Sequence, residues 1–330
     1  MDLTMIVFLI IFLAIILYKA KIGKNINNSF FEKEQSKVIK GICCIIVFLV
    51  HVPKEHGNAI QDAIGSFGYI CVTIFFLLSA YGLKYSINNK KDYLKHFFRN
   101  RIISIYIPFV IANTLWQLLG FEDGIDIWAI IGIDSFSFIG ELIIFYLLFY
   151  IIYKNIDNKK ADFIMIGATL VISIVSYVFQ IGWFVECLGF AYGIIFYNLE
   201  ERINNYFNKS YLKKVLSLCI ISLILGTVYI RLKNIIILNY IFKILLGISI
   251  VGFLICLFKK VKLNNKILTF LGNISFEIYL LHEIIMKILI GLNISSGCYI
   301  VTSLLLTIIL ACIMNYIDMK ITKAIKYNKR

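Results

Sequence analysis

Long apolar runs, separated by short polar segments rich in lysine, make up most of this chain. Crossing a hydrocarbon core about 30 Å thick takes roughly 20 mostly apolar residues in a helix. Eleven runs reach or approach that length, which predicts an all-α polytopic membrane protein with about eleven transmembrane helices. The runs lie near residues 3–19, 38–53, 66–83, 102–119, 138–153, 161–179, 184–198, 215–230, 235–256, 267–290 and 297–317.

Two segments of this pattern allow alternatives. Glu122, Asp123 and Asp126, followed by IWAIIGIDSFSF, form an acidic amphipathic segment that could lie in the membrane interface or dip into it, and we count it as a loop. The first run could be a cleaved signal peptide, but Asp2 precedes it and lysines follow it, so we expect a retained first helix. We divide the chain into residues 1–34 (N-terminal helix and loop), 35–318 (membrane domain) and 319–330 (basic tail).

Composition supports the membrane interpretation. Hydrophobic residues make up 60% of the chain, charged residues 16%, and the mean hydropathy is +0.87, whereas soluble domains carry roughly 25% charged residues. The net charge of +14 would suggest nucleic acid in a soluble protein. However, most of the 33 basic residues follow odd-numbered runs or lie in the tail; the five exceptions are Lys54, Arg231, Lys233, Lys243 and Lys287.

Such one-sidedness follows the positive-inside rule. It predicts an N-terminus outside, a C-terminus in the cytoplasm, membrane lipids as surroundings and no nucleic-acid partner. Abundant Ile, Asn and Lys with two prolines are typical of an AT-rich bacterial genome, so we expect the bacterial plasma membrane.

The eight cysteines occur singly or as one adjacent pair within apolar runs. The chain has no C-x-x-C motif and no His/Cys cluster with ligand spacing, so we expect neither a metal site nor a disulfide scaffold. Their expected role is that of small hydrophobes in helix packing.

The first candidate chemistry lies in KGICCIIVFLVH, residues 40–51. Lys40 and His51 stand eleven residues apart, which on a helix is three turns plus about 20° and roughly 16 Å along the axis. Both therefore share one helix face, with the lysine at the cytoplasmic boundary and the imidazole in the outer half. A buried imidazole can accept and return a proton; alternatively, His51 only touches lipid headgroups.

The second constellation is GNISFEIYLLHEIIMKI, residues 272–288. Ser275, Tyr279 and His282 fall at i, i+4 and i+7 and so share one helical stripe, while Glu283 and Lys287 form an i,i+4 pair on a neighbouring face. The stripe either lines a polar cavity or bonds neighbouring helices.

A third set lies where the membrane is expected to meet the cytoplasm. Ser79 falls near the end of the third run, where small residues also serve helix packing. Arg99 and Arg101, with Lys95, begin the fourth run, which contains Pro108. Cytoplasmic basic residues suit anionic lipid headgroups or a phosphate-rich cofactor.

Taken in this order, the chain resembles the acyltransferase-3 family of integral membrane acyltransferases over about residues 35–318. The stretches that carry the resemblance are KGICCIIVFLVH (40–51), GYICVTIFFLLSAYGL (68–83), FFRNRIISIYIPF (97–109), FYLLFYII (145–152), LGFAYGIIFY (188–197) and ISFEIYLLHE (274–283). Members of that family take an acyl group, often acetyl and sometimes succinyl, from cytoplasmic acyl-coenzyme A. They place it on surface polysaccharide, lipopolysaccharide, peptidoglycan or lipid-linked precursors.

The resemblance implies acyl-CoA as a co-substrate, no permanently bound cofactor, and a surface glycan or lipid-linked sugar as acceptor. The family's basic residue before an essential histidine corresponds to Lys40 and His51, with lysine where arginine is usual. The family's R-x-x-R corresponds to Arg101 and Ser104, so the second arginine is absent. Ser79 matches the family serine, with Ala80 where glycine is usual.

These correspondences give each candidate a role. His51 is expected to be the general base, and His282, which matches a family histidine, to orient the acceptor, share the proton or stabilise the oxyanion. Coenzyme A is expected to contact Lys40, Arg99, Arg101 and Ser79, and the acceptor Tyr279, Ser275 and Glu283. Direct transfer and an acyl-histidine intermediate both remain open. Some relatives carry an appended hydrolase-like domain; here we expect transfer within the membrane domain.

Two other functions fit the same pattern. A transporter or flippase of a lipid-linked sugar or small anion would also have many helices and buried polar groups, although two similar inverted halves are not visible in this sequence. A non-catalytic scaffold or sensor is the third interpretation.

Overall fold

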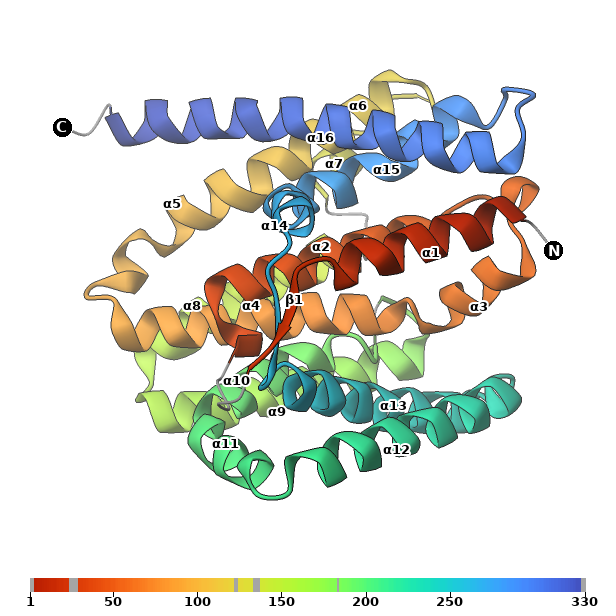
Figure 1. Ribbon diagram of the computed structural model, residues 1–330. Helices are drawn as coiled ribbons and strands as arrows, with labels where there is room; N and C mark the ends of the chain where they lie inside the picture. The colour runs from red at the N-terminus through yellow and green to blue at the C-terminus, as the bar shows by residue number, and fades with distance from the viewer. Residues whose placement is uncertain (1–2, 24–28, 122–123, 133–136, 183, 328–330) are drawn as a thin grey trace.

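The computed structural model describes residues 3–23, 29–121, 124–132, 137–182 and 184–327. Over these residues the chain is almost entirely helical, with most helices running roughly along one direction and the two termini at opposite ends (Figure 1). The first half consists of α1 (Leu3–Leu17), β1 (Ala20–Ile22), α2 (Lys33–Val50), α3 (Ala59–Phe67), α4 (Tyr69–Asn89), α5 (Phe97–Arg101), α6 (Ile107–Leu118), α7 (Ile127–Ile131) and α8 (Phe138–Asn155).

The second half continues in the same way. It consists of α9 (Asn158–Phe179), α10 (Leu188–Asn198), α11 (Glu200–Asn208), α12 (Tyr211–Leu232), α13 (Ile236–Leu257), β2 (Val261–Leu263), α14 (Lys266–Asn273), α15 (Ser275–Leu289) and α16 (Ser296–Tyr327).

The prediction of an all-α polytopic membrane protein is confirmed, and every predicted run coincides with a helix or helix pair. Among the described residues, seven helical segments are long and apolar enough to cross a membrane, and an eighth is obtained if the bent pair α14–α15 counts as one span. The expected eleven is therefore larger than this count. The difference arises because α1 and α10 are short and α2 begins with charged residues.

The acidic segment after the fourth run is only partly described. Residues 122–123 and 133–136 lie outside the described residues, but Ile127–Ile131 form the short helix α7, which packs against α6. Asp126 caps this helix by accepting a hydrogen bond from the backbone N–H of Trp128 at 2.8 Å. The segment that we counted as a loop therefore contains one helical turn that lies on the protein.

Helix α4 occupies the middle of the structure and packs closely against α10. A Cβ atom at Gly189 would lie 2.2 Å from the carbonyl oxygen of Thr73, and one at Gly193 would lie 2.4 Å from that of Leu77. The two backbones thus touch where α10 has no side chain, as is common for small residues in membrane helices.

A second glycine contact fixes α14 against α2. A Cβ atom at Gly272 would lie 1.8 Å from the carbonyl oxygen of Lys37, and one at Gly41 would lie 2.2 Å from that of Leu268. Helix α14, seen end-on in Figure 1, therefore crosses α2 with the backbones in contact. The chain then bends by 74° into α15, which packs against α2, α6 and α16.

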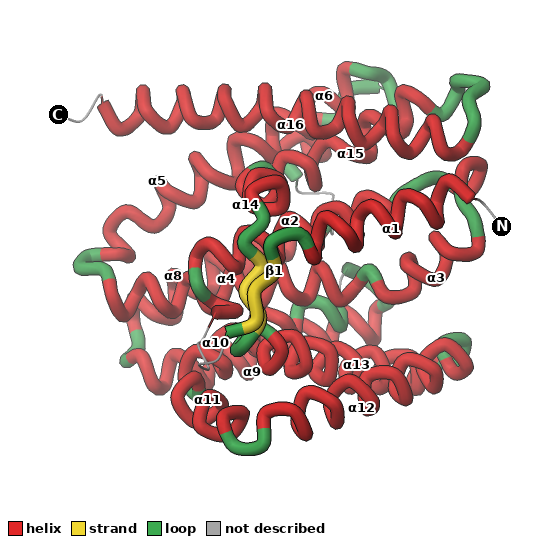
Figure 2. Tube along the Cα trace, in the orientation of Figure 1, coloured by secondary structure: helices red, strands yellow, loops and turns green. Residues whose placement is uncertain are grey.

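The small antiparallel sheet holds the end of α1 to the connection before α14. Ala20 pairs with Leu263 and Ile22 with Val261, shown in yellow in Figure 2. The Asn265 side chain accepts hydrogen bonds from the backbone N–H groups of Ile267 and Leu268 and donates one to the carbonyl oxygen of Ile15. The start of α14 is thereby fixed from both sides.

Pro108 marks an irregularity in the helix that follows Arg101. Residues Ile102–Tyr106 form a π-helical stretch between α5 and α6. Proline lacks a backbone N–H, and its ring clashes with the carbonyl group four residues earlier, so a wider local turn relieves the contact. This stretch carries Ser104, which lies with Arg101 on the wall of a cavity described below.

Candidate active site

Two cavities lie along the face that α15 presents to its neighbours. The first, about 360 Å³, is lined by Lys40, Ser79, Arg101, Ser275 and Tyr279 among others. These five residues were all predicted to belong to the site, and they come from α2, α4, α5 and α15. The structure thus brings them together from four separate segments of the chain.

The second cavity, about 250 Å³, lies farther along α15. Its lining includes Tyr279, His282 and Glu283, together with residues of α6 such as Asn113, Trp116 and Gln117. Tyr279 lines both cavities, and its ring packs against Phe138, with the centroids 5.2 Å apart. The predicted stripe Ser275–Tyr279–His282 therefore does line polar cavities, and Tyr279 stands at the boundary between them.

The first cavity carries positive charge without an acidic partner in its wall. Lys40 and Arg101 line it, and none of the described residues that line it is Asp or Glu. Arg101 Nη2 donates to the Tyr93 hydroxyl at 3.2 Å, and the guanidinium lies 5.1 Å from the centroid of the Tyr146 ring. An enclosed pair of cations that is not neutralised by carboxylates attracts a multivalent anion.

Arg99 does not line either cavity among the described residues. Its predicted contact with a cofactor therefore has no support from the cavity geometry. Ser104, which stands where the sequence resemblance implies a second arginine, does line the first cavity. A neutral hydroxyl at this position leaves the charge of the first cavity to Lys40 and Arg101.

His51 ends α2 and is held there by backbone contacts. Its Nδ1 lies 2.8 Å from the carbonyl oxygen of Val47. Because a carbonyl oxygen only accepts, Nδ1 carries the proton and Nε2 of the neutral ring keeps its lone pair. Gln61 Nε2 donates to the carbonyl oxygen of Leu49 at 2.8 Å, so α3 supports this helix end.

His282 has the same arrangement on α15. Its Nδ1 lies 2.7 Å from the carbonyl oxygen of Tyr279, and Nε2 is buried without a hydrogen-bond partner. The ring is 2% exposed, and its centroid lies 4.8 Å from that of His51 with the planes at 72°. The two imidazoles therefore meet edge to face, each with Nδ1–H bonded to its own helix.

Glu283 faces both rings. Its Oε1 lies 3.5 Å from His51 Nε2 and 3.9 Å from His282 Nε2. One ligand atom from each of these three residues lies within 4.8 Å of the others, so small side-chain movements would let one metal ion contact all three. Glu283 was predicted to bind the acceptor; in the structure its carboxylate lies beside the rings of His51 and His282.

The predicted pairing of Glu283 with Lys287 is wrong. These two residues form no ion pair in the structure; Lys287 Nζ instead lies 4.1 Å from the centroid of the Trp116 ring and 5.4 Å from that of Phe121. The reason is that Glu283 turns toward the imidazoles of α2 and α15, while the lysine is attracted to the electron-rich aromatic faces beside the second cavity.

Sequence reasoning missed the polar residues of α6. Asn113 Nδ2 donates to the carbonyl oxygen of Ala129 at 3.0 Å, and Gln117 Oε1 accepts from the backbone N–H of Asp126 at 3.1 Å. These contacts hold the segment around α7 over the second cavity. The signal was present, because Asn113 and Gln117 lie one turn apart within an apolar run.

The model of the family described as an acyltransferase domain matches residues 34–316 of this chain. The chain belongs to the acyltransferase-3 family. The match spans the helices that carry both cavities and the two histidines. The matched region, which contains several apolar helices long enough to cross a membrane, is therefore an integral membrane acyltransferase domain. No curated protein and no solved structure matches the chain.

This acyltransferase-3 domain also holds two buried ionic clusters away from the cavities. In one of them, Lys84 Nζ lies 2.6 Å from Asp162 Oδ1, and both residues are buried. Tyr153 donates to Oδ1 and Asn198 to Oδ2 of the same carboxylate. Four helices, α4, α8, α9 and α10, therefore meet at one carboxylate.

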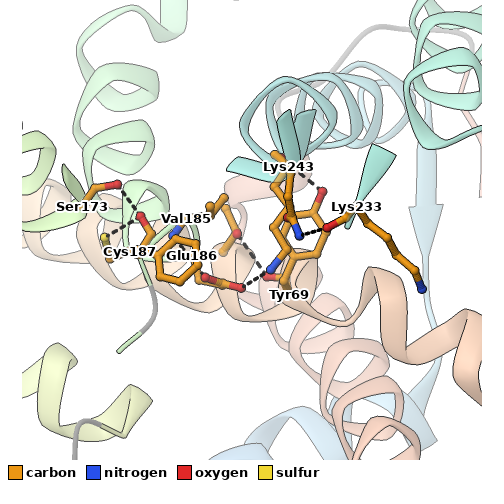
Figure 3. A network of polar contacts seen from close by, with 10 residues as sticks. Tyr69, Ser173, Val185, Glu186, Cys187, Lys233 and Lys243 are labelled. Carbon is orange, nitrogen blue, oxygen red and sulfur yellow. Dashed lines mark hydrogen bonds and ion pairs between the residues drawn. The ribbon is translucent and has the colours of Figure 1, made fainter. Parts of the chain in front are cut away.

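The second cluster joins α13 to α4 and to the start of α10. Lys243 Nζ lies 3.6 Å from Glu186 Oε1 and 5.0 Å from the centroid of the Tyr69 ring, and the Tyr69 hydroxyl donates to the carbonyl oxygen of Lys243 (Figure 3). Lys243 is one of the five basic residues that depart from the one-sided charge pattern. The buried Glu186 explains the exception, because an ion pair lowers the cost of a lysine within an apolar helix.

Proposed function

We propose that this chain transfers an acetyl or succinyl group from acyl-CoA to a hydroxyl of a surface or lipid-linked glycan. The observation that carries the proposal is the arrangement of the two cavities in a domain of this family. One cavity has uncompensated positive charge, and Tyr279 borders both cavities. The other has His282 and Glu283 in its wall, and the His51 ring lies against these two residues.

The first cavity is proposed to bind the donor. Lys40 and Arg101 suit the phosphates of coenzyme A, because charge-assisted hydrogen bonds to phosphate are strong in an enclosed site. Along α2, His51 follows Lys40 by eleven positions, which corresponds to roughly 16 Å. The extended pantetheine arm would carry the thioester over this distance toward Tyr279.

His51 is proposed to act as the general base. A sugar hydroxyl is a poor nucleophile until a positioned base accepts its proton, an effect that typically contributes about 10²- to 10⁴-fold. Nε2 of His51 has the free lone pair for this step, and Glu283 lies where it would stabilise the imidazolium that forms. His282 would share this proton through its own unpartnered Nε2.

In the proposed reaction one ester bond forms, one thioester bond breaks, and one proton passes from the acceptor to the leaving thiolate. The acceptor oxygen attacks the thioester carbonyl carbon while its proton moves to His51 Nε2, and the carbonyl oxygen becomes an oxyanion. The C–S bond then breaks, and the leaving thiolate receives the proton from His51. In the neutral tautomer, Nε2 of His282 has no hydrogen to donate to the oxyanion. We therefore propose that the hydroxyl of Tyr279, which lines both cavities, donates the hydrogen bond that stabilises it.

The proposed orientation follows the charge pattern of the sequence. The first cavity would open to the cytoplasm, where acyl-CoA is made, and the second to the outer side of a bacterial plasma membrane. The N-terminus would then be outside and the C-terminus in the cytoplasm. Cysteine-accessibility labelling at each terminus of the intact chain in whole cells tests this orientation.

The decisive experiment uses the purified full chain in lipid with radiolabelled acetyl-CoA and a lipid-linked glycan extract as acceptor. The expected result is release of free CoA and label in the glycan, both of which are lost in His51→Ala. A transporter, flippase or scaffold would release no CoA under any condition. Labelled glycan in His51→Ala at the wild-type rate would exclude His51 as the base.

A further inference from the structure

Three electron-pair acceptors converge between α2 and α15 with no donor among them. Nδ1–H of His51 and Nδ1–H of His282 are both engaged by backbone carbonyl oxygens, so each neutral ring presents Nε2 toward Glu283. The His282 Nε2 atom is fully buried and has no partner. The side chains of His51 and Glu283 are partly exposed, at 27% and 52%, whereas that of His282 is buried. Lone pairs that face one another repel, and a positive charge between them would relieve this repulsion.

The spacing of the three atoms suits a metal ion. Ligand atoms bound at 2.0–2.1 Å in a tetrahedral zinc site lie about 3.3 Å apart. Here Glu283 Oε1 lies 3.5 Å from one imidazole nitrogen and 3.9 Å from the other, and all three ligand atoms lie within 4.8 Å of one another. Small side-chain rotations therefore suffice to close the site around an ion.

The surroundings also have the form of a metal site. Histidine ligands usually donate their other ring N–H to a carbonyl oxygen or a carboxylate, which fixes the tautomer. Both rings already do so, through Val47 and Tyr279. His282 and Glu283 line the second cavity, from which water could supply a fourth ligand.

We propose that His51, His282 and Glu283 bind a divalent transition-metal ion of the Zn²⁺ class, and that the bound metal blocks acyl transfer by occupying Nε2 of His51. Two imidazole nitrogens and one carboxylate favour such ions over Mg²⁺ or Ca²⁺, which require mostly oxygen ligands. Binding takes up no electrons; the metal replaces any proton held between the three groups, and that proton is released to water. The sequence predicted no metal, because His51 and His282 lie on distant segments.

The binding claim is tested without reference to activity. The purified full chain in detergent, stripped of metals, is titrated with Zn²⁺ by calorimetry and with Co²⁺ by visible absorption. We expect about one ion per chain and a Co²⁺ spectrum typical of tetrahedral coordination. Glu283→Gln and His282→Ala should each weaken binding at least 10-fold, whereas His96→Ala and Glu55→Gln, at exposed positions, should bind as the wild type does.

Folding is controlled in the same samples by size-exclusion elution and thermal unfolding. Equal Zn²⁺ affinity in the wild type and in a well-folded Glu283→Gln, or loss of binding in His96→Ala, would overturn the proposed site. So would the absence of any binding to a well-folded wild type.

The inhibition claim rests on the proposed function and has its own readout. Release of CoA by the wild type should fall as Zn²⁺ saturates the calorimetric site and should return when a chelator is added. Activity that rises with Zn²⁺ and disappears on chelation would overturn the blocking role. If no condition releases CoA, the proposed function fails, while the binding titrations still decide whether the metal site exists.

Discussion

The imidazole of His51, at the end of α2, meets that of His282, in the middle of α15, edge to face with ring centroids 4.8 Å apart. Each ring donates its Nδ1–H to the helix that carries it. Both therefore direct their second nitrogen toward the carboxylate of Glu283. The pair is a consequence of how two helices cross, and its chemistry can be tested residue by residue.

Replacing His51 by alanine should remove the proton acceptor while leaving the fold intact. We expect acyl transfer to fall by about 10²- to 10⁴-fold, measured as release of free CoA from labelled acetyl-CoA in the presence of acceptor. His96→Ala is the matched control, because His96 is exposed and is not among the described residues that line either cavity, and it should retain full activity. Equal rates in the two variants would contradict the assignment.

Glu283→Gln should slow transfer without weakening donor binding. The carboxylate is proposed to stabilise the protonated His51, and hydrogen bonds to charged groups contribute about 1.5–3 kcal/mol. This corresponds to a loss of about 10- to 150-fold in kcat. Steady-state kinetics should show an unchanged KM for acyl-CoA; a change confined to that KM would place Glu283 in the donor site instead.

Charge reversal in the first cavity should weaken donor binding. Lys40→Glu and Arg101→Glu should each raise the KM for acyl-CoA by at least 10-fold, because they place a carboxylate beside the bound phosphates. Lys40→Arg keeps the charge and should be tolerated. Titration of acyl-CoA against purified variants gives the measurement, with Lys95→Glu, at an exposed position, as the control. Unchanged donor affinity in Lys40→Glu would remove its phosphate role.

Two substitutions at Tyr279 should separate the role of its hydroxyl, which is proposed to stabilise the oxyanion, from that of its ring, which borders both cavities. Tyr279→Phe keeps the ring but removes the hydroxyl, and loss of one oxyanion donor typically costs about 10²- to 10³-fold in kcat. Tyr279→Ala in addition opens the boundary between the cavities, so it should accept longer acyl chains relative to acetyl. Competition between acetyl-, butyryl- and hexanoyl-CoA measures this preference. An acyl preference that is the same in both variants would show that the ring does not limit acyl length.

The Lys84–Asp162 pair should matter for stability. Asp162→Asn leaves Lys84 buried without its counter-charge, and breaking a buried pair from one side costs about 3–5 kcal/mol. We expect a large fall in the thermal unfolding midpoint of the purified protein in detergent. The exposed pair Lys37–Glu34 provides the comparison, since Glu34→Gln should cost less than about 1 kcal/mol. Similar midpoints for the two variants would contradict this role.

Much of the architecture could be derived from the apolar runs alone. Each predicted run is helical because an isolated segment in hydrocarbon must satisfy its own backbone hydrogen bonds. The number of spans was less predictable. Short helices such as α10 and the bent pair α14–α15 have apolar composition without the length of a straight span, and their position depends on packing against neighbours.

The candidate site was predictable where one helix carries it. The spacing of Ser275, Tyr279 and His282 placed all three on the face that lines the cavities. The partnership of Glu283 with His51 was not predictable, because it depends on the crossing of α2 with α14 and the bend that follows. Helical periodicity instead suggested Lys287, which the structure places over Trp116.

The aromatic side chain that borders both cavities has a consequence for the membrane as a whole. A path open from one side to the other would let small ions run down the transmembrane voltage, at about 2.3 kcal/mol per elementary charge for each 100 mV. The ring of Tyr279, which lines both cavities, packs against Phe138, and this contact would help to keep the two spaces apart. If the two cavities open to opposite sides of the membrane, as proposed, acyl transfer through this protein would leave the membrane potential intact.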